Sequence, residues 1–181
     1  IRLPEMLYAR VVGAAERVGA HGRVLEPLDT AKLKQDLTEA RAAGLDSVAV
    51  VFLHGYRFPQ HEVAAAEVAR SLGFRQVSVS HRALPLPKLV VRGDTTLADA
   101  YLSPVLDRYV TSVRRGLEAL GSPRLYFMQS HGGLTAAEHF RGKDSLLSGP
   151  AGGVVGMVRA ARALGCGEVI GFLRRGAKGV R

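Results

Sequence analysis

Apolar positions recur along the chain with two different spacings, and these predict strands and helices in alternation. The segment Ser47–Leu53 is almost continuously apolar, as a strand covered on both faces should be, and Gln76–Ser80 reads as a second strand. Elsewhere, apolar residues recur every three or four positions, which is typical of amphipathic helices. Such positions are Leu33, Leu37 and Ala40 in one segment and Ala65, Val68, Ala69 and Leu72 in the next. The alternation predicts an α/β fold with a mixed, mainly parallel sheet and flanking helices.

Cap and turn residues mark the limits of these elements. Asp29 is placed to cap a helix that begins at Thr30, and Pro59 suits the first turn of the next helix. Before Asp29, the segments Ala9–Val18 and Gly22–Leu28 flank a short turn and predict a hairpin. Glycines are expected to end the helices, namely Gly44, Gly73, Gly121 and Gly165.

The second half of the chain continues the alternation with more interruptions. Asp94 is the predicted N-cap of a long helix, which Pro104 should kink or split. Strands are expected at Leu125–Gln129 and Glu168–Leu173, and Thr135–Glu138 has the pattern of a capping box for a short helix. The elements divide the chain into four predicted parts: a hairpin segment (1–28), an α/β region (29–147), a helix with a strand (148–173) and a basic tail (174–181).

Composition and charge limit the classes of protein to which the chain can belong. The chain has 181 residues, of which 47% are apolar and 23% charged, so a folded domain is expected rather than disorder. The net charge is +9, but Lys and Arg are interspersed with acids and only 6% of residues are aromatic, which argues against nucleic-acid binding. The basic tail concentrates positive charge at Arg174, Arg175, Lys178 and Arg181.

Membrane and secretory classes are also disfavoured. The longest apolar run, Val48–Leu53, is far shorter than the roughly 20 residues of a membrane-spanning helix. The single Cys166 excludes an internal disulfide and fits a reducing cytoplasm. Because Ile1 replaces an initiator methionine, the chain is expected to begin partway through a longer protein.

The histidines do not form a metal-binding pattern, and no metal site is predicted. His54 and His61 flank a loop–helix junction, where cap and loop hydrogen bonds are favoured over a zinc site. His131 precedes Gly132 and Gly133 after a predicted strand, where α/β folds place ligands; a structural turn is the favoured interpretation and a ligand site the alternative.

Two further segments are candidate ligand sites. Arg92, Thr95 and Thr96 form a polar cluster, for which a helix cap is favoured over a ligand contact. A glycine-rich segment begins a helix at Ser148, and such glycines can expose backbone N–H groups to phosphate, although the segment lacks the Lys of a P-loop. Close packing of this helix against another backbone is the favoured role of Gly152, Gly153 and Gly156. Its inward-facing residues are expected to be Val154, Met157, Val158 and Ala161.

Several strings, in their order and spacing, resemble the hydantoinase/oxoprolinase family over residues 3 to about 172. They are LPEMLYARVVGAAERV at 3–18, HGYRFPQHE at 54–62, VSVSH at 77–81, VRGDTTLADAYLSPVLDRYV at 91–110, FMQSHGGL at 127–134 and FRGKDSLLSGPAGGVVGMV at 140–158. The forms at 91–110 and 140–158 are more similar to the ATP-dependent 5-oxoprolinase branch of this family than to hydantoinase A subunits.

This resemblance implies a hydrolase that uses ATP and Mg²⁺ to open the lactam of 5-oxo-L-proline to L-glutamate, a reaction of glutathione metabolism. Phosphorylation of the amide oxygen would make it a leaving group and allow water to attack. It also implies an actin-like ATPase (ribonuclease H-like) architecture, in which two acidic glycine-rich loops hold the phosphates and the metal. The helix beginning at Ser148 would then connect to the second loop. That role implies candidate residues on the nucleotide side or at a hinge, namely Ser148, Gly149, Pro150, Gly152 and Gly153.

The chain departs from the family pattern at the phosphate loops. The first loop is absent, and the acidic second loop expected after Phe172 is replaced by residues that include Arg174 and Arg175. We therefore expect a truncated or frame-disrupted product that binds no cofactor stably and is inactive alone. In the whole enzyme, its partners would be the lactam and the rest of the enzyme or a second subunit. The alternatives are a fragment of an ATP-dependent hydantoinase A-type subunit and a non-catalytic α/β binding module.

Overall fold

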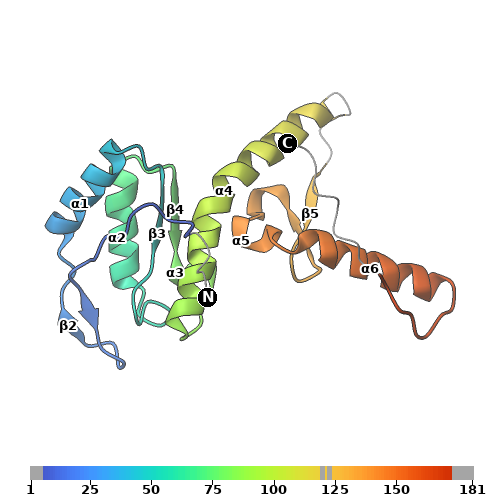
Figure 1. Ribbon diagram of the computed structural model, residues 1–181, viewed down its shortest axis with the longest axis horizontal. Helices are drawn as coiled ribbons and strands as arrows, with labels where there is room; N and C mark the ends of the chain where they lie inside the picture. The colour runs from blue at the N-terminus through green and yellow to red at the C-terminus, as the bar shows by residue number, and fades with distance from the viewer. Residues whose placement is uncertain (1–5, 119–120, 122–123, 173–181) are drawn as a thin grey trace. The chain divides into compact units, whose positions relative to one another are not determined.

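The computed structural model describes residues 6–118, 121 and 124–172. The chain forms two compact units that divide between Arg108 and Tyr109 (Figure 1). Strands alternate with helices in both units, so the predicted α/β class is confirmed. The strands form three two-stranded sheets, of which one is parallel and two are antiparallel.

A parallel strand pair lies at the centre of the first unit. Strand β3 (Ser47–Val50) pairs in register with β4 (Gln76–Val79), and α2 (Gln60–Ser71) connects them. Helices α1 (Thr30–Ala42) and α2 lie on one side of the pair, and the first part of α4 (Leu89–Leu117) lies on the other (Figure 1). The carboxyl ends of β3 and β4 therefore meet at one edge, beside the short helix α3 (Ser80–Ala83).

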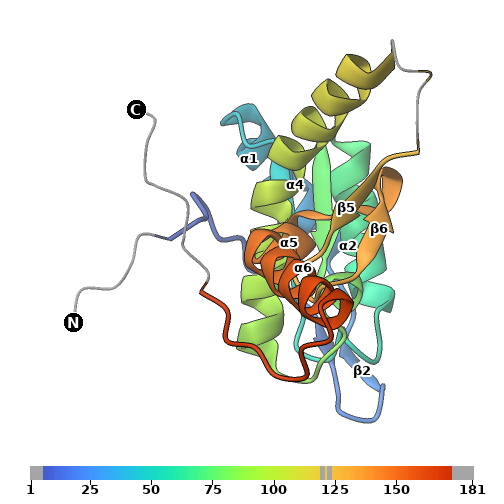
Figure 2. The same cartoon turned by 90° about the vertical axis from the view of Figure 1, so that its right-hand side faces the viewer.

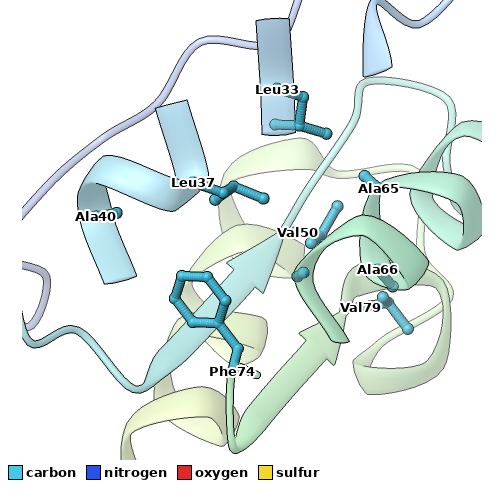
Figure 3. Close-up of a cluster of buried hydrophobic side chains, with 9 residues drawn as sticks. Leu33, Leu37, Ala40, Val50, Ala65, Ala66, Phe74 and Val79 are labelled. Carbon is cyan, nitrogen blue, oxygen red and sulfur yellow. The ribbon is translucent and has the colours of Figure 1, made fainter. Parts of the chain in front are cut away.

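The core of the first unit joins α1 and α2 to the strand pair. Apolar side chains from α1, α2, β3, β4 and the turn after α2 meet there (Figure 3). The buried members are Leu33, Leu37, Ala40, Val50, Ala65, Ala66, Ala69, Phe74 and Val79. The helical spacing in the sequence predicted the buried faces of α1 and α2, apart from Ala66 and a charged residue discussed below.

Caps and turns end the elements where the sequence indicated. The carboxylate of Asp29 accepts a hydrogen bond of 2.9 Å from the Lys32 backbone N–H and so caps α1. Gly44 and Gly73 follow α1 and α2 with φ of +86° and +81°, in the left-handed region that glycine adopts without strain. The predicted hairpin is also present, formed by β1 (Arg17–Val18) and β2 (Val24–Glu26).

Two histidines fasten this hairpin region to the unit. The Nδ1 atom of His54 lies 2.7 Å from the carbonyl oxygen of Val18, and Nδ1 of His61 lies 2.7 Å from a Glu16 carboxylate oxygen. Hydrogen bonds that join loop and helix start to the preceding segment are therefore confirmed as the role of both histidines.

The long helix α4 begins earlier than predicted. Asp94 is an exposed residue inside the helix, not its N-cap, because helical hydrogen bonding already includes Arg92 N–H to the Lys88 carbonyl oxygen at 3.0 Å. Pro104 also lies inside α4, which continues to Leu117, so the predicted split is absent.

An apolar cavity of about 570 Å³ lies beside β3 in the first unit. Its walls include Leu33 and Leu37 of α1, Val48 and Val50 of β3, and Leu97 of α4, together with the segment that begins at Leu7. The cavity thus lies between the two helical layers at the edge of β3 that does not face β4.

The second unit is built around an antiparallel strand pair. Strand β5 (Tyr126–Met128) pairs with β6 (Leu134–Ala136), and α6 (Ser148–Ala163) packs against β5 (Figure 2). The short helices η2 (Ala137–His139) and α5 (Gly142–Ser145) lie between them in the sequence. Phe127 stacks on Phe140 with 4.9 Å between ring centroids.

Two expectations for this unit are wrong. Thr135 lies in β6 and makes no capping contact with η2, because the strand pairing extends through Ala136 and leaves Thr135 outside the N-cap position. Residues 168–172 form no strand. They find no partner strand among the described residues, and Ile170 and Phe172 are 91% and 97% exposed. Leu173 and the basic tail lie outside the described residues.

A surface ion pair connects α4 with η2 in this unit. The Arg114 guanidinium contacts the Glu138 carboxylate. The hydrogen bond from its own backbone is the main cause that lowers the pKa of Glu138; desolvation opposes it, and the charge of Arg114 adds a smaller lowering effect. Because the pair is exposed to solvent, it adds little to stability.

Candidate functional site

A buried polar cluster lies at the carboxyl ends of β3 and β4. It comprises Glu62 of α2, Ser80 and His81 of α3, and Arg92 of α4. The side chains of Glu62 and Arg92 are completely buried, and that of His81 is 14% exposed. In α/β folds, ligands bind beyond the carboxyl ends of parallel strands, so the cluster occupies the position where a site is expected.

Glu62 is the centre of the cluster because its carboxylate accepts hydrogen bonds from four other residues. Oε1 accepts from the Phe52 backbone N–H at 2.9 Å, from the Ser80 hydroxyl, and from Arg92 Nη1 at 3.4 Å. Oε2 accepts from the backbone N–H and from Nδ1 of His81, at 3.0 and 2.8 Å. One carboxylate therefore joins the residues that follow both parallel strands.

Arg92 completes the cluster from the opposite side. Its Nη2 donates to the carbonyl oxygens of Phe52 and Leu53, each at 2.8 Å, and its Nη1 also contacts the Ser80 hydroxyl. The guanidinium carbon lies 5.7 Å from the centre of the Tyr56 ring. Nε of Arg92 is buried and has no hydrogen-bond partner among the described residues. Arg92 thus neutralises Glu62 and fixes the chain where it leaves β3.

Local sequence explains how Glu62 reaches this position. Its helical neighbours at spacings of three, four and seven are Ala65, Ala66 and Ala69, all buried, so Glu62 occupies the first position of the buried face of α2. Gly55 supplies the space, because a Cβ atom at this position would overlap the Glu62 carboxylate.

Replacement of Gly55 by alanine is expected to lower the free energy of unfolding by about 1–3 kcal/mol, because the added methyl group displaces the Glu62 carboxylate. Urea denaturation followed by circular dichroism would measure this change. Gly13→Ala is the control, since nothing lies within 4 Å of its added Cβ. Equal stability of the two variants would contradict the packing at Gly55.

A second polar group continues the cluster along α4. The Ser78 hydroxyl of β4 donates to Asp99 Oδ2 at 2.7 Å, and the Ser103 hydroxyl donates to Asp99 Oδ1 at 3.3 Å. All three residues are buried. Ser78 of β4 thus faces the polar residues of α4 on that side of the strand pair.

The structure places the predicted polar trio Arg92, Thr95 and Thr96 within α4 and separates their environments. Arg92 joins the Glu62 cluster, whereas the hydroxyl of Thr96 is buried and donates to the Arg92 carbonyl oxygen at 2.6 Å. The hydroxyl of Thr95 donates to the Val91 carbonyl oxygen at 2.9 Å. Neither threonine caps the helix, because α4 begins upstream of both.

His131 and its glycines form a turn between β5 and β6. The backbone N–H of Gly133 donates to His131 Nδ1 at 3.1 Å, and Gly132 has a φ of +86°. Beside them, Ser130 N–H and its hydroxyl both donate to the Asp144 carbonyl oxygen at 2.7 Å. A structural turn accounts for these contacts, and a ligand role of His131, Gly132 and Gly133 stays a prediction.

The glycine-rich start of α6 does not make the close backbone contact that we expected. A Cβ on Gly152 would lie 3.5 Å from Met128 Cγ, which is ordinary side-chain contact, and nothing lies within 4 Å of one on Gly149 or Gly156. Gly153 is exposed, as is Val154 at 43%, whereas Ala161 is buried as predicted. A nucleotide-side or hinge role of Ser148, Gly149, Pro150, Gly152 and Gly153 stays a prediction.

Replacement of Gly156 by alanine is expected to raise the free energy of unfolding by about 0.5–1 kcal/mol, because glycine weakens a helix interior and space is open there. Gly165→Ala is the opposite case, with equally open space but a φ of +71°. Gly165→Ala should lower the free energy of unfolding by about 1–2 kcal/mol. Thermal unfolding of both variants would test the contrast, and a destabilised Gly156→Ala would reveal a hidden contact.

Sequence reasoning missed most of the buried cluster. Glu62, Ser80, His81 and Asp99 were not among the predicted site residues, and only Arg92 was. A usable signal was present at Glu62, because it shares a helix face with three alanines and no polar residue. A second signal was that Ser80 and His81, rather than a glycine turn, follow the strand β4.

The described residues do not fit a Mg²⁺ site by themselves. No three His, Cys, Asp or Glu side chains gather there in a group that could hold a metal ion. The carboxylate of Glu62 is enclosed and already engaged with Arg92 and His81, so it offers no free edge to a cation. In the same part of the chain, no helix combines the length and apolarity needed to cross a membrane.

Comparison with known proteins identifies the class. Residues 1–73 match the model of the hydantoinase/oxoprolinase N-terminal region, and residues 92–172 match the hydantoinase/oxoprolinase model. The chain belongs to the hydantoinase/oxoprolinase family. Glu62, His81 and Arg92, which meet in the cluster, come from three of the strings that carried the resemblance.

Within this family, the chain is similar to 5-oxoprolinases. It is 37% identical to the 5-oxoprolinase of Dictyostelium discoideum over 86% of its own length, and 42% identical to that of Saccharomyces cerevisiae over 74%. It spans only 14% and 10% of those two proteins.

Solved structures have the same fold. The ATP-dependent caprolactamase of Pseudomonas jessenii matches 84% of the chain with a TM-score of 0.77 and 29% identity, and the chain spans 23% of it. Nucleotide-free acetone carboxylase matches 84% of the chain with a TM-score of 0.74 and 23% identity, and the chain spans 22% of it.

Proposed function

We propose that this chain is part of an ATP-dependent 5-oxoprolinase, which hydrolyses 5-oxo-L-proline to L-glutamate with cleavage of ATP. The observation that carries the proposal is the Glu62–His81–Arg92 cluster, which unites three family strings at the carboxyl edge of the parallel strands. Similarity to 5-oxoprolinases, and to a caprolactamase that also acts on a lactam, supports the substrate class.

The chemistry of the cofactor belongs to the whole enzyme in this proposal. ATP activates the lactam, and Mg²⁺ is held by parts of the enzyme other than the described residues, whose donor set does not fit the metal. The contribution of this chain is the buried cluster, which holds the ends of β3 and β4 rigid. Rigid support of this kind keeps reacting groups in a productive geometry.

The remaining expectations concern partners and location. We propose that the chain acts with the rest of a longer enzyme or with a second subunit, as the existence of a caprolactamase subunit alpha in this family supports. Cys166 is a free and exposed thiol, which supports the predicted cytoplasmic location.

A chimera would test the proposed function. Residues 6–172 would replace the matching segment of the Dictyostelium discoideum 5-oxoprolinase, and phosphate release from ATP would be measured with Mg²⁺ and 5-oxoproline. Release that depends on 5-oxoproline is expected. Release stimulated by hydantoin instead would favour the hydantoinase alternative, and a folded chimera without release would favour the non-catalytic module.

A further inference from the structure

The contact with Glu62 fixes the tautomer of His81. An ionised carboxylate only accepts hydrogen bonds, so His81 Nδ1, at 2.8 Å from Glu62 Oε2, must carry the proton. In the neutral ring, the lone pair then lies on Nε2. Nε2 has no hydrogen-bond partner among the described residues, and the side chain keeps 14% of its surface exposed.

His81 lies at the carboxyl edge of the parallel strands, where a ligand is expected. His81 follows the last residue of β4 by two positions, and the segment after β3 is tied to the same carboxylate through Phe52. Among the described residues, the charged groups that contact the ring or its partner are Glu62 from α2 and, through Glu62, Arg92 from α4.

His61 provides an internal comparison. Its Nδ1 also faces a carboxylate, that of Glu16, at 2.7 Å. However, His61 lies in the first turn of α2 and joins that helix to the segment before β1, so its contact is accounted for by fastening the hairpin region. The same pairing at His81 lies instead at the carboxyl end of the parallel strands.

We propose that His81 is the general base of lactam hydrolysis and that Glu62 is its positioning residue; this rests on the proposed function. Phosphorylation of the lactam oxygen by ATP leaves a carbon–nitrogen double bond that water can attack. Nε2 accepts a proton from water as the water oxygen bonds to the lactam carbon, and the electron pair of the double bond moves to nitrogen. The added hydroxyl then loses its proton and forms a carbonyl group, the bond between carbon and nitrogen breaks, and His81 gives its proton to the leaving nitrogen. A second water hydrolyses the resulting acyl phosphate to L-glutamate and phosphate.

Kinetics of the chimera with His81→Asn would test this role. The asparagine amide nitrogen takes the place of Nδ1 and still donates to Glu62, but nothing replaces Nε2. We expect kcat to fall by about 10²–10⁴-fold, the usual contribution of a general base. His61→Asn, which keeps its contact with Glu16 in the same way, should leave kcat unchanged. Equal kcat for both variants would show that His81 is only structural.

The tautomer can be measured without any assay of activity. In the ¹⁵N-histidine-labelled chain, nitrogen NMR shifts should show His81 protonated at Nδ1, and Glu62→Gln should disturb this preference. Protonation at Nε2 instead would overturn the role of His81, whatever the kinetics. An inactive unmodified chimera overturns the proposed function and, with it, the reaction step. An active chimera with unaffected His81→Asn kinetics overturns the role of His81 alone.

Discussion

Replacement of Glu62 by leucine is expected to lower the free energy of unfolding by about 3–5 kcal/mol, the range for removal of one partner of a buried ion pair. Arg92 has no exposed surface and would keep its charge without a counter-ion. Ser80 and the backbone N–H groups of Phe52 and His81 would lose their acceptor at the same time.

Two comparisons make this prediction specific. Glu67→Leu changes an exposed acid of the same helix and should alter stability by less than about 0.5 kcal/mol. The double variant Glu62→Leu with Arg92→Met removes both charges, so it should be more stable than Glu62→Leu alone. Urea denaturation of the unmodified chain, Glu62→Leu, Arg92→Met and the double variant gives the cycle. A double variant no better than the single would show that Arg92 does not depend on Glu62 for its charge balance.

The isolated chain is expected to release no phosphate from ATP in response to 5-oxoproline. The described residues supply no metal-binding group of acids, and the chain spans only 14% of the length of the Dictyostelium discoideum 5-oxoprolinase. Without a metal site among these residues, they cannot stabilise the transition-state charge on the transferred group. Weak binding of ATP to the basic tail at Arg174 and Arg175 would be lost in salt.

Phosphate release by the purified chain would be measured beside that full-length relative, with ATP, Mg²⁺ and 5-oxoproline. Turnover that depends on 5-oxoproline and comes within about tenfold of the relative would show that the catalytic groups lie within this chain. A low rate that is independent of 5-oxoproline would agree with the prediction.

Most of the first unit could be predicted because its elements are locally specified. Apolar spacing fixed the buried face of α1, and Asp29 and Gly44 fixed its ends. The start of α4 could not be predicted in this way, since Asp94 has the composition of a cap but lies where helical hydrogen bonding has already begun. The prediction of a strand at residues 168–172 was wrong for a different reason, because a strand needs a neighbouring strand to pair with, and apolar composition alone does not supply one.

The site was less predictable than the fold. Arg92 appeared as a candidate because arginine beside threonines stands out in a sequence, whereas its partner Glu62 lies 30 positions away on another helix. Pairing of charges from separate elements depends on tertiary packing, which periodicity does not encode. The resemblance to the family located the strings that carry Glu62, His81 and Arg92 but gave no indication that they meet.

The enclosed carboxylate of Glu62 also has a consequence for local opening of the first unit. The backbone N–H groups of Phe52 and His81 both donate hydrogen bonds to it, although Phe52 lies outside any strand or helix. To reach solvent, either proton requires separation of α2, α3 and α4 around Glu62, rather than fraying of one element. Hydrogen exchange at these two amides should therefore be as slow as at the centre of α2, and should report cooperative opening of the whole unit.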